Sequence, residues 1–465
     1  MMRYGSAQRR IFLLSLMVFL LQLGIVRSAN AISVQDETVM GQKFVESIRK
    51  EFDLLDDDFA SDYLNDLGQY LIQAAETRPF PFQFYLIQDN NLNAFAGPGG
   101  HVFMFSGLVS AMDTVDELAA VLCHEAAHVT ARHLSERMEQ AQKIGYATMA
   151  GMLASILVGG KAGGAIASGT VAASIQKQLG YSREDERQAD QIGFQYMSRS
   201  GFDPAGMIVT LTNLEKGQYH GADVIPPYLL THPGGAERIS NIQSMLSSST
   251  KGGEKDQKRR YQELFPYFRT VVRARTGEPH EVEAQFRKEL EKEPDSPLAL
   301  FGLGVLWQER SEHDKAIEIF RKALRNRPDS LPIMRKLAES YHLKGMDKAA
   351  VDILEKVFRA NTQDKASLYL LARSYQNMED HTQAIRIFER LLLLKPVKDE
   401  IYYNLGVSYG RENRLALAHY NFGIYFKRLG EKSKATFHFQ KAEGFSSGDP
   451  VLAEKIREEA KPLRR

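Results

Sequence analysis

Residues 114–130 read TVDELAAVLCHEAAHVT, and this stretch decides how the first half of the chain is interpreted. Thr114 and the glutamate three residues after it form a capping box, and apolar residues follow at helical spacing, so we predict a helix. His124 and His128 lie four residues apart and therefore share one helix face. Both imidazoles can reach one metal ion, with Glu125 beside the open coordination position. Such a short pattern also arises by chance, so a third ligand has to be found.

The segment 181–190, YSREDERQAD, supplies that third ligand on a second predicted helix. Glu186 can complete a set of two histidines and one carboxylate. Asp190 lies one helical turn later and can accept a hydrogen bond from the far nitrogen of a ligand histidine, for which we expect His124. Taken alone, the segment would be interpreted as a solvated charged helix face.

The chain contains a single cysteine, Cys123. One cysteine excludes a disulfide framework and a zinc site built from several thiolates. A metal site in this chain must therefore use histidines and carboxylates. Because Cys123 lies in an apolar stretch, we assign it to packing.

Four motifs together resemble peptidase family M48, a family of zinc metallopeptidases. They are HEAAH at 124–128, SRxxExxxD starting at Ser182, THP at 231–233 followed by Glu237 and Arg238, and NAFAGPGG at 93–100. The resemblance covers about residues 35–247. It implies a zincin-type domain that holds one zinc ion per chain through His124, His128 and Glu186.

The resemblance also implies peptide hydrolysis, in which zinc activates a water molecule and Glu125 takes its proton and delivers it to the leaving amine. A further donor to the oxyanion would be Arg238 or His232. His232 has a second interpretation, because it lies on the glycine-containing loop 231–235. Its imidazole would occupy the fourth zinc position, displace the water and hold the enzyme latent. Packing of the loop is the third alternative.

We expect short strands at 82–88 and 101–106, with a turn at 97–100. An edge strand carrying Phe95 and Ala96 would hold an extended substrate by main-chain hydrogen bonds. These strands would equally serve as an ordinary core sheet.

Residues 145–180 are rich in Gly, Ala and small aliphatic residues. The apolar part, 145–160, is too short to span a bilayer. We interpret the segment as a mobile flap or helical hairpin beside the cleft that touches a membrane or an assembly partner, with a buried core hairpin as the equal alternative.

A 34-residue period runs through the second half of the chain. The recurring residues are Leu303, Leu337, Leu371 and Leu405; Trp307, Tyr341, Tyr375 and Tyr409; Ala316, Ala350, Ala384 and Ala418; and Phe320, Leu354, Phe388 and Phe422. This pattern resembles the tetratricopeptide repeat over about 297–432, preceded by a degenerate repeat that starts near Arg260. Ala435 and Phe439 repeat the second-helix spacing after only half a period, which predicts a shifted capping pair. Such repeats stack into a solenoid whose concave wall binds extended peptide or a partner protein.

The N-terminus has the pattern of a signal peptide. Arg3, Arg9 and Arg10 precede an apolar run at 11–26, and a small-x-small pattern predicts cleavage after Ala31. A retained membrane anchor and a twin-arginine signal are the alternatives. Charge is balanced at 59 Lys+Arg against 58 Asp+Glu, which leaves no basic excess for nucleic acid.

We therefore predict an α+β, mostly helical protein, with a small sheet in its first domain and an all-α solenoid in its second. The expected divisions are a signal peptide at 1–31, the metallopeptidase domain at 32–247, a linker at 248–260, the repeats at 261–446 and a tail at 447–465. Together with the resemblances, this order implies a periplasmic endopeptidase in outer-membrane protein assembly and quality control. Its substrates would be unfolded or misassembled outer-membrane proteins, its repeats would dock the β-barrel assembly machinery, and any membrane contact would be peripheral. A chaperone or scaffold with a latched zinc site is the alternative.

Overall fold

The computed structural model describes most of the chain. The described residues are 32–140, 181–216, 226–248, 256–394 and 397–464. The predicted signal peptide at 1–31 and the whole of the Gly/Ala-rich segment at 145–180 lie outside them.

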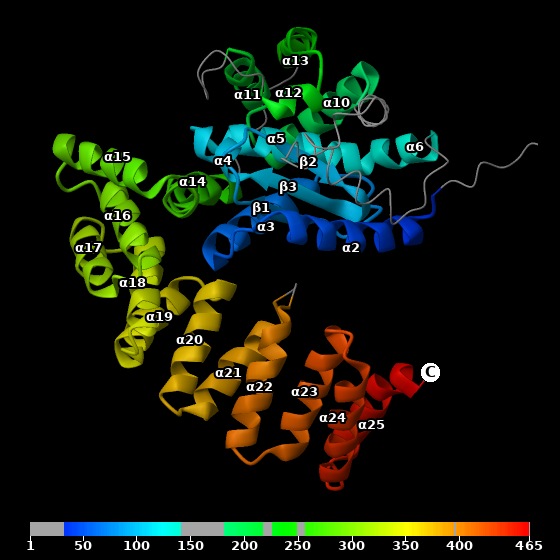
Figure 1. The fold of residues 1–465 in the computed structure, drawn as a ribbon, viewed down its shortest axis with the longest axis vertical. Helices are drawn as coiled ribbons and strands as arrows, with labels where there is room; N and C mark the ends of the chain where they lie inside the picture. Colours follow the sequence, from blue (N-terminus) through cyan, green and yellow to red (C-terminus); the bar gives the residue numbers. More distant parts are fainter. Residues whose placement is uncertain (1–31, 141–180, 217–225, 249–255, 395–396, 465) are drawn as a thin grey trace, which may run out of the picture.

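The first half of the chain folds around a small sheet (Figure 1). Its elements are α2 (Val34–Glu51), α3 (Asp58–Ile72), β1 (Gln83–Ile87), β2 (Ala94–Gly97), the 3₁₀ helix η1 (Pro98–Gly100), β3 (His101–Phe105), α4 (Ser106–Ala111), α5 (Val115–Thr130), α6 (His133–Gln140), α10 (Arg183–Ser200), α11 (Ala205–Glu215), α12 (Pro227–Thr231) and α13 (Gly235–Ser248).

The sheet has the strand order β1-β3-β2. β1 pairs with β3 in parallel, with Tyr85 opposite Phe103, and β2 pairs with β3 antiparallel, with Phe95 opposite the same residue. The turn between β2 and β3 contains Gly99 and Gly100, both at positive φ. Only glycine adopts that backbone readily, which explains the glycine pair in the predicted turn.

Each face of the sheet is covered by helices. One face, with Phe84 and Met104, joins the core that contains the apolar residues of α3 and α5. The other face, with Phe95 and Phe103, packs on Phe44 of α2. The sheet therefore lies between α2 on one side and α3 with α5 on the other.

Helix α5 is the predicted helix, and its capping box is present. The Thr114 hydroxyl accepts a hydrogen bond from the backbone of Glu117, whose carboxylate accepts one from the backbone of Thr114. Apart from Asp116 and Thr130, every residue of this helix is buried. A helix that is buried all round is rigidly placed, which suits a helix that carries functional side chains.

The second half of the chain is entirely helical in its described residues. Its elements are α14 (Asp256–Thr276), α15 (Pro279–Lys292), α16 (Pro297–Glu309), α17 (His313–Asn326), α18 (Leu331–Leu343), α19 (Asp347–Ala360), α20 (Lys365–Asn377), α21 (His381–Leu392), α22 (Asp399–Arg411), α23 (Leu415–Arg428), α24 (Lys432–Phe445), α25 (Pro450–Ala460) and the 3₁₀ helix η2 (Lys461–Arg464).

The 34-residue period corresponds to pairs of helices. At Gly304 and Gly406 an added Cβ would lie 2.4 and 2.7 Å from the rings of Phe320 and Phe422, so the two helices of a pair touch there as the pattern predicts. The pairing also extends beyond the predicted repeats at both ends. α14 begins at Asp256, inside the range predicted as a linker, and α25 lies inside the predicted tail.

The end of the array contains the closely packed extra helix that the half-period spacing predicts. An added Cβ at Gly423 of α23 would lie 2.5 Å from the ring of Phe439 in α24, as at Gly304 and Gly406 within the repeats. Phe439 also lies 34 residues after Leu405, and the buried Ile456 of α25 lies 34 residues after Phe422. α24 therefore packs on α23 as a second helix does and is followed by one more helix, α25.

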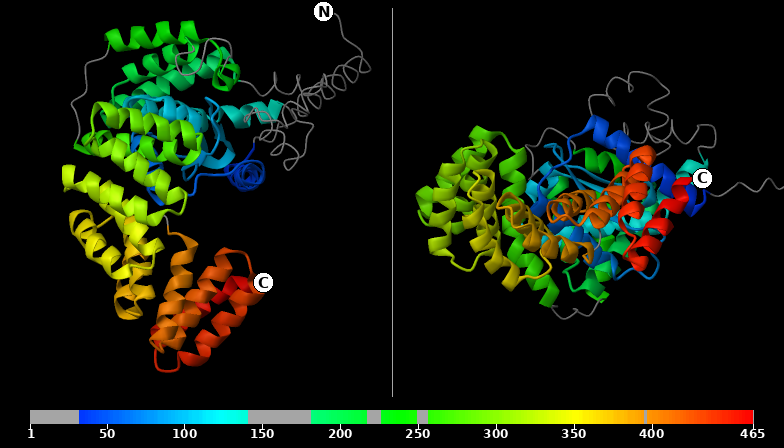
Figure 2. Two further views of the ribbon diagram at one scale, coloured as in Figure 1. Left: turned by 60° about the vertical axis from the view of Figure 1, so that its left-hand side comes forward. Right: turned by 90° about the horizontal axis from the view of Figure 1, so that it is seen from below.

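The helical array starts on the first domain and curves beneath it (Figures 1 and 2). Tyr63 of α3 donates a hydrogen bond to the carbonyl of Tyr261 in α14 at 2.8 Å and stacks on Phe268. Farther along, Lys365 of α20 lies 3.5 Å from Asp66 of α3. The concave side of the array therefore faces α3.

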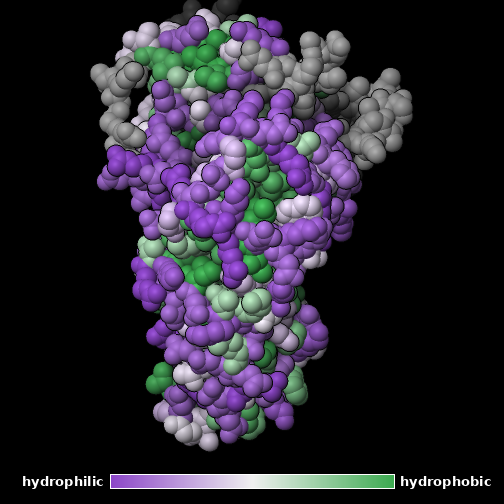
Figure 3. Space-filling model, turned by 90° about the vertical axis from the view of Figure 1, so that its left-hand side faces the viewer, coloured by the Kyte–Doolittle hydropathy of each residue, from purple (hydrophilic) through white to green (hydrophobic). Residues whose placement is uncertain are grey.

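One outer side of the molecule, seen in Figure 3, is mostly hydrophilic, with hydrophobic residues in strips between hydrophilic ones. Among the described residues, none of the helices has the length and apolar character that crossing a membrane requires.

Candidate metal centre

Four buried side chains bring their ligand atoms together at the centre of the first domain. They are His124, His128, Glu186 and His232, and one ligand atom from each lies within 4.8 Å of all the others. All four residues are at most 2% exposed. The histidine pair and the carboxylate predicted from the sequence therefore meet, and His232 joins them.

The distances between these atoms fit a single tetrahedral metal ion. Ligand atoms about 2.1 Å from such an ion lie about 3.4 Å apart. The Nε2 atoms of His128 and His124 are 3.0 Å apart, and Nδ1 of His232 is 3.3 Å from Nε2 of His124. Glu186 Oε1 lies 3.4 Å from Nε2 of His128 and 3.0 Å from Nδ1 of His232. Two imidazoles, a carboxylate and a third imidazole are ligands that zinc accepts.

Close packing of two helices brings Glu186 to the histidines. α10 crosses α5 at Gly193, where an added Cβ would lie 3.3 Å from the backbone of Cys123 and His124. A capping box at Ser182 starts α10, so that Glu186 falls in its first turn. His232 directly follows α12 and is the C-cap of this helix.

Asp190 and Arg238 support the ligands from behind. Asp190 Oδ1 lies 3.0 Å from Nδ1 of His124, the contact expected from the sequence. Arg238 donates hydrogen bonds from Nε and a terminal nitrogen to both oxygens of Asp190, each at 2.8 Å, and its other terminal nitrogen lies 2.8 Å from Glu186 Oε2. The guanidinium thus binds two carboxylates that would otherwise be buried without a cation.

The pKa values of these carboxyl groups reflect that arrangement. Burial alone would raise the pKa of Asp190, but the charge of Arg238 and the bond with His124 outweigh it and lower the pKa. Burial alone would also raise the pKa of Glu186. The neighbouring His232 and Arg238 outweigh this effect and hold the pKa well below its ordinary value. Both groups are therefore anionic in the fold.

Glu125 is fully buried, and neither carboxylate oxygen has a hydrogen-bond partner among the described residues. Nε2 of His232 lies 3.6 Å from Oε1 of Glu125. A buried carboxylate without a hydrogen-bond partner destabilises the folded state. Its presence beside the four metal-ligand atoms therefore indicates a chemical role. Cys123 is also fully buried, and burial raises the pKa of its thiol, which fits packing.

Three further residues at the centre are not among the predicted site residues. His133 lies 2.9 Å from the far nitrogen of His128, and Gln188 lies 2.7 Å from the other nitrogen of His133. Tyr181 stacks on the ring of His128 at 3.8 Å between centroids, and its buried hydroxyl has no partner within the described part of the chain. Tyr181 lies just before the capping Ser182, and His133 lies five residues after His128. Neither position follows a helical period, so a search for helical patterns does not select them.

The two residues predicted for the substrate strand lie on opposite faces of the sheet. The side chain of Phe95 joins the cluster on α2, away from the metal centre, and Ala96 joins the core that includes α5. β2 is an edge strand of the three-stranded sheet formed by the described residues. All four residues of β2 are buried, and the role of Phe95 and Ala96 in holding a substrate stays a prediction.

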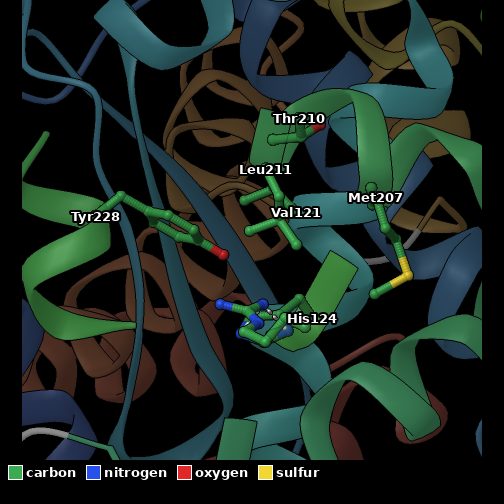
Figure 4. A pocket seen from close by; sticks show the side chains of 8 residues that line it. Val121, His124, Met207, Thr210, Leu211 and Tyr228 are labelled. Carbon is green, nitrogen blue, oxygen red and sulfur yellow. Dashed lines mark hydrogen bonds between the residues drawn. The ribbon is translucent and has the colours of Figure 1, made fainter. Parts of the chain in front are cut away.

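A small pocket adjoins the ring of His124 (Figure 4). It is lined by Ala120, Val121, His124, Met207, Thr210, Leu211, Tyr228 and Arg238. Tyr228 extends its ring towards His124 in this view and stacks on His232 at 4.4 Å between centroids. The lining is mostly apolar.

Comparison with known protein families agrees with this geometry. Residues 60–246 match Peptidase family M48, and residues 269–330 and 369–419 match the tetratricopeptide repeat. The chain carries an M48 peptidase domain followed by tetratricopeptide repeats. The residues that form the metal centre all lie inside the M48 match.

Named relatives resemble the M48 domain. The beta-barrel assembly-enhancing protease of Yersinia pestis is 39% identical over 222 residues, which cover 47% of this chain and 45% of that protein. Its counterpart in Escherichia coli K12 is 36% identical over 221 residues, with the same coverage. The mitochondrial metalloendopeptidase OMA1 of Saccharomyces cerevisiae is 33% identical over 162 residues, or 34% of this chain and 45% of that protein. The match thus spans about half the length of these relatives.

Solved structures resemble this chain only loosely. The crystal structure of MamA is 21% identical, with a TM-score of 0.31, and the match covers 37% of this chain and 96% of that one. YrrB, described as a TPR protein with an unusual peptide-binding site, is 22% identical with a TM-score of 0.28 over 37% of this chain and 97% of that one.

Proposed function

We propose that this chain is a zinc endopeptidase in which Glu125 is the general base. The observation that carries the proposal is the pair of buried, unpartnered oxygens of Glu125 beside four converging metal-ligand atoms. His124, His128 and Glu186 would hold one zinc ion per chain. Bound zinc would lower the pKa of a water molecule and polarise the substrate carbonyl.

The residues of this chain have separate tasks in that reaction. Glu125 accepts a proton on a carboxylate oxygen and then delivers it to the leaving amine. Asp190 orients His124, and Arg238 keeps Asp190 and Glu186 anionic and in place. Because Arg238 is engaged with these two carboxylates, we assign it a positioning role rather than that of oxyanion donor.

His232 has two candidate roles, and its position favours one of them. Its Nδ1 lies among the ligand atoms, which supports the latch, in which the imidazole takes the position that water needs. Its other nitrogen, Nε2, lies 3.6 Å from Oε1 of Glu125. A hydrogen-bond donor to the substrate oxyanion would also lie beside Glu125, so this contact is compatible with the donor role. Increased casein hydrolysis by His232→Ala would support the latch, and loss of hydrolysis would support the donor.

The experiment that tests the proposed activity compares Glu125→Gln with the matched exposed variant Glu136→Gln. Both proteins should retain zinc, because neither residue is a proposed ligand. Casein hydrolysis should fall at least about 100-fold in Glu125→Gln alone, the usual contribution of a general base. A purified wild-type chain without zinc, or equal hydrolysis by the two variants, would refute the proposal.

We place this activity in the periplasm, in the assembly and quality control of outer-membrane proteins. The names of the bacterial relatives and the signal-peptide pattern support that location and role. Unfolded or misassembled outer-membrane proteins would be the substrates, held in extended form along β2. The repeats would dock the assembly machinery.

A scaffold or chaperone function is the second candidate. The observation that favours it is that four protein side chains converge on the metal position, as in structural zinc sites. Restoration of barrel assembly in cells by the Glu125→Gln chain would support the scaffold. Failure of that variant, with normal protein levels, would support the peptidase.

A further inference from the structure

His133 and Gln188 form a second support of the metal centre, at His128 rather than at His124. We propose that His133 is a positioning residue that fixes the tautomer and orientation of the zinc ligand His128, and that Gln188 fixes His133 in turn. The inference rests on the proposed zinc site and goes beyond the ligands and Asp190, which the sequence already indicated.

The contacts run in one line from the ligand to the surface. Nε2 of His128 faces the other ligand atoms, and its Nδ1 lies 2.9 Å from Nδ1 of His133. Nε2 of His133 lies 2.7 Å from Oε1 of Gln188. His128 and His133 are 1% and 2% exposed, whereas Gln188 is exposed on α10. Water therefore has little access to the two inner members.

The hydrogen-bond chemistry allows one arrangement of protons along this line. A neutral histidine that binds metal through Nε2 carries its proton on Nδ1 and donates it. His133 must accept at Nδ1, so its own proton lies on Nε2. That proton is donated to Gln188, whose carbonyl oxygen is an acceptor only. Each member thus determines the tautomer of the one before it.

The backbone is bent at the one point that brings His133 into place. In a continuous helix, a residue five positions after His128 would point about 140° away from it. α5 instead ends at Thr130, and Arg132 adopts a left-handed conformation with φ 57°. This conformation costs about 1–2 kcal/mol for a residue other than glycine. The chain then turns into α6, with His133 as its first residue.

The strained turn is held by a buried acid from another helix. Arg132 bonds through Nε and a terminal nitrogen to Glu37 of α2, at 3.2 and 2.9 Å, and also donates to the carbonyl of Ile32. Ser135 donates to the same Glu37 oxygen. Backbone strain that is maintained by several contacts is typical of functional sites. The turn therefore places His133 beside His128. Ser311, Glu379 and Asn413 adopt the same backbone at turns between helices of the array, so the contacts to Glu37, and not the conformation alone, distinguish this turn.

The test measures zinc affinity of the full chain by competition with a chromophoric chelator. His133→Leu removes the acceptor, His133→Asn keeps an acceptor near Nδ1, and Gln188→Leu changes only the exposed end of the line. His101→Leu is the matched control, because His101 is a buried histidine of β3 that bonds Tyr85 and is not part of the metal centre. The visible spectrum of the cobalt-loaded chains reports the ligand field directly.

We expect His133→Leu to bind zinc about 10–100-fold more weakly, with an altered cobalt spectrum. His133→Asn should recover most of the affinity, and His101→Leu should match the wild type. Gln188→Leu should weaken binding less, and adding it to His133→Leu should cause no further loss, because the two act in one line.

Wild-type zinc affinity in Gln188→Leu and in a folded His133→Leu would overturn the proposal, as would equal weakness of His133→Leu and His133→Asn. If His133→Leu does not fold, the zinc affinity of Gln188→Leu tests the proposal instead, because Gln188 is exposed and its replacement should not affect folding. Casein hydrolysis by the wild type with unchanged zinc affinity in all variants would reject the positioning role and leave the peptidase intact. A wild-type chain that binds no zinc would reject both.

Discussion

Lys336 of α18 places its Nζ 2.6 Å from Oδ2 of Asp57, which caps the start of α3, although 279 residues separate them. Both side chains are buried, and Arg275 of α14 lies 3.1 Å from the same oxygen. Burial alone would raise the pKa of Asp57, but the two cations outweigh it and hold the pKa well below its ordinary value. This buried ionic cluster joins the repeat array to the M48 domain.

Removing one partner of that cluster should therefore be costly. We expect Lys336→Met to lower the free energy of unfolding by about 3 kcal/mol, the lower end for a broken buried ion pair, because Arg275 still neutralises Asp57. Urea titration of the full chain measures the loss. Lys348→Met is the control, since Lys348 forms an exposed pair with Asp352, and it should leave the unfolding curve unchanged. Equal curves for the two variants would show that the interface does not depend on the buried pair.

The same interface contains a carboxyl group with the opposite tendency. Burial raises the pKa of Asp62 from 3.8 to about 6, although Arg335, Lys365 and Lys398 oppose the shift and only Asp58 adds to it. A carboxyl group with a raised pKa contributes stability that is complete below the pKa of the unfolded chain and is lost as the pH rises through about 6.

Asp62→Asn should remove that dependence. We expect its free energy of unfolding to rise relative to the wild type as the pH increases from about 4 to about 7, with most of the change between about pH 4 and pH 6. Parallel urea titrations across this range measure the difference. A difference between the two proteins that stays constant with pH would contradict the raised pKa.

How much of this molecule follows from its sequence depends on the distance over which each feature is encoded. The capping box of α5 and the 34-residue helix pairs of the array follow local patterns, and these predictions are confirmed. The two histidines of α5 meet at one point, as their four-residue spacing predicts, and their role as metal ligands stays a prediction. His133 follows no period, because its position depends on the left-handed turn at Arg132 and on Glu37, 95 residues away.

The contact between the array and α3 is likewise not encoded in any period. Asp57, Asp62 and Lys336 look like ordinary charged positions of helices, and only the curvature of the stacked repeats brings them together. Such a contact depends on small rotations that add up over several helix pairs. The roles of Glu125, His232 and Arg238 in catalysis stay predictions.

The close approach of paired helices in the array gives a third prediction. A Cβ at Gly304 would lie 2.4 Å from the ring of the buried Phe320, so Gly304→Ala has to push α16 and α17 apart. We expect a loss of about 1–3 kcal/mol in the free energy of unfolding, as for other overpacked cores. Gly444→Ala in α24 is the matched control, because nothing lies within 4 Å of its Cβ, and it should be neutral or stabilising by up to about 1 kcal/mol. Similar losses in both variants would mean that helix contact at Gly304 is not what selects glycine there.

Arg238 provides the last prediction, because it binds two carboxylates of the metal centre at once. Arg238→Met would leave Asp190 and Glu186 buried without their cation, so the carboxylates should shift or take up protons and release their hold on His124. We expect zinc affinity to fall about 10–100-fold, as for other supporting residues of metal sites. Arg238→Lys should fall between this variant and the wild type, because an ammonium group keeps the charge but cannot reproduce the two parallel bonds to Asp190.

Chelator competition measures the zinc affinity of all three chains. If Arg238→Lys bound zinc as weakly as Arg238→Met, charge alone would be insufficient and the paired geometry would be decisive; if Arg238→Met bound zinc as tightly as the wild type, Arg238 would have no supporting role and its assignment as an oxyanion donor would regain strength.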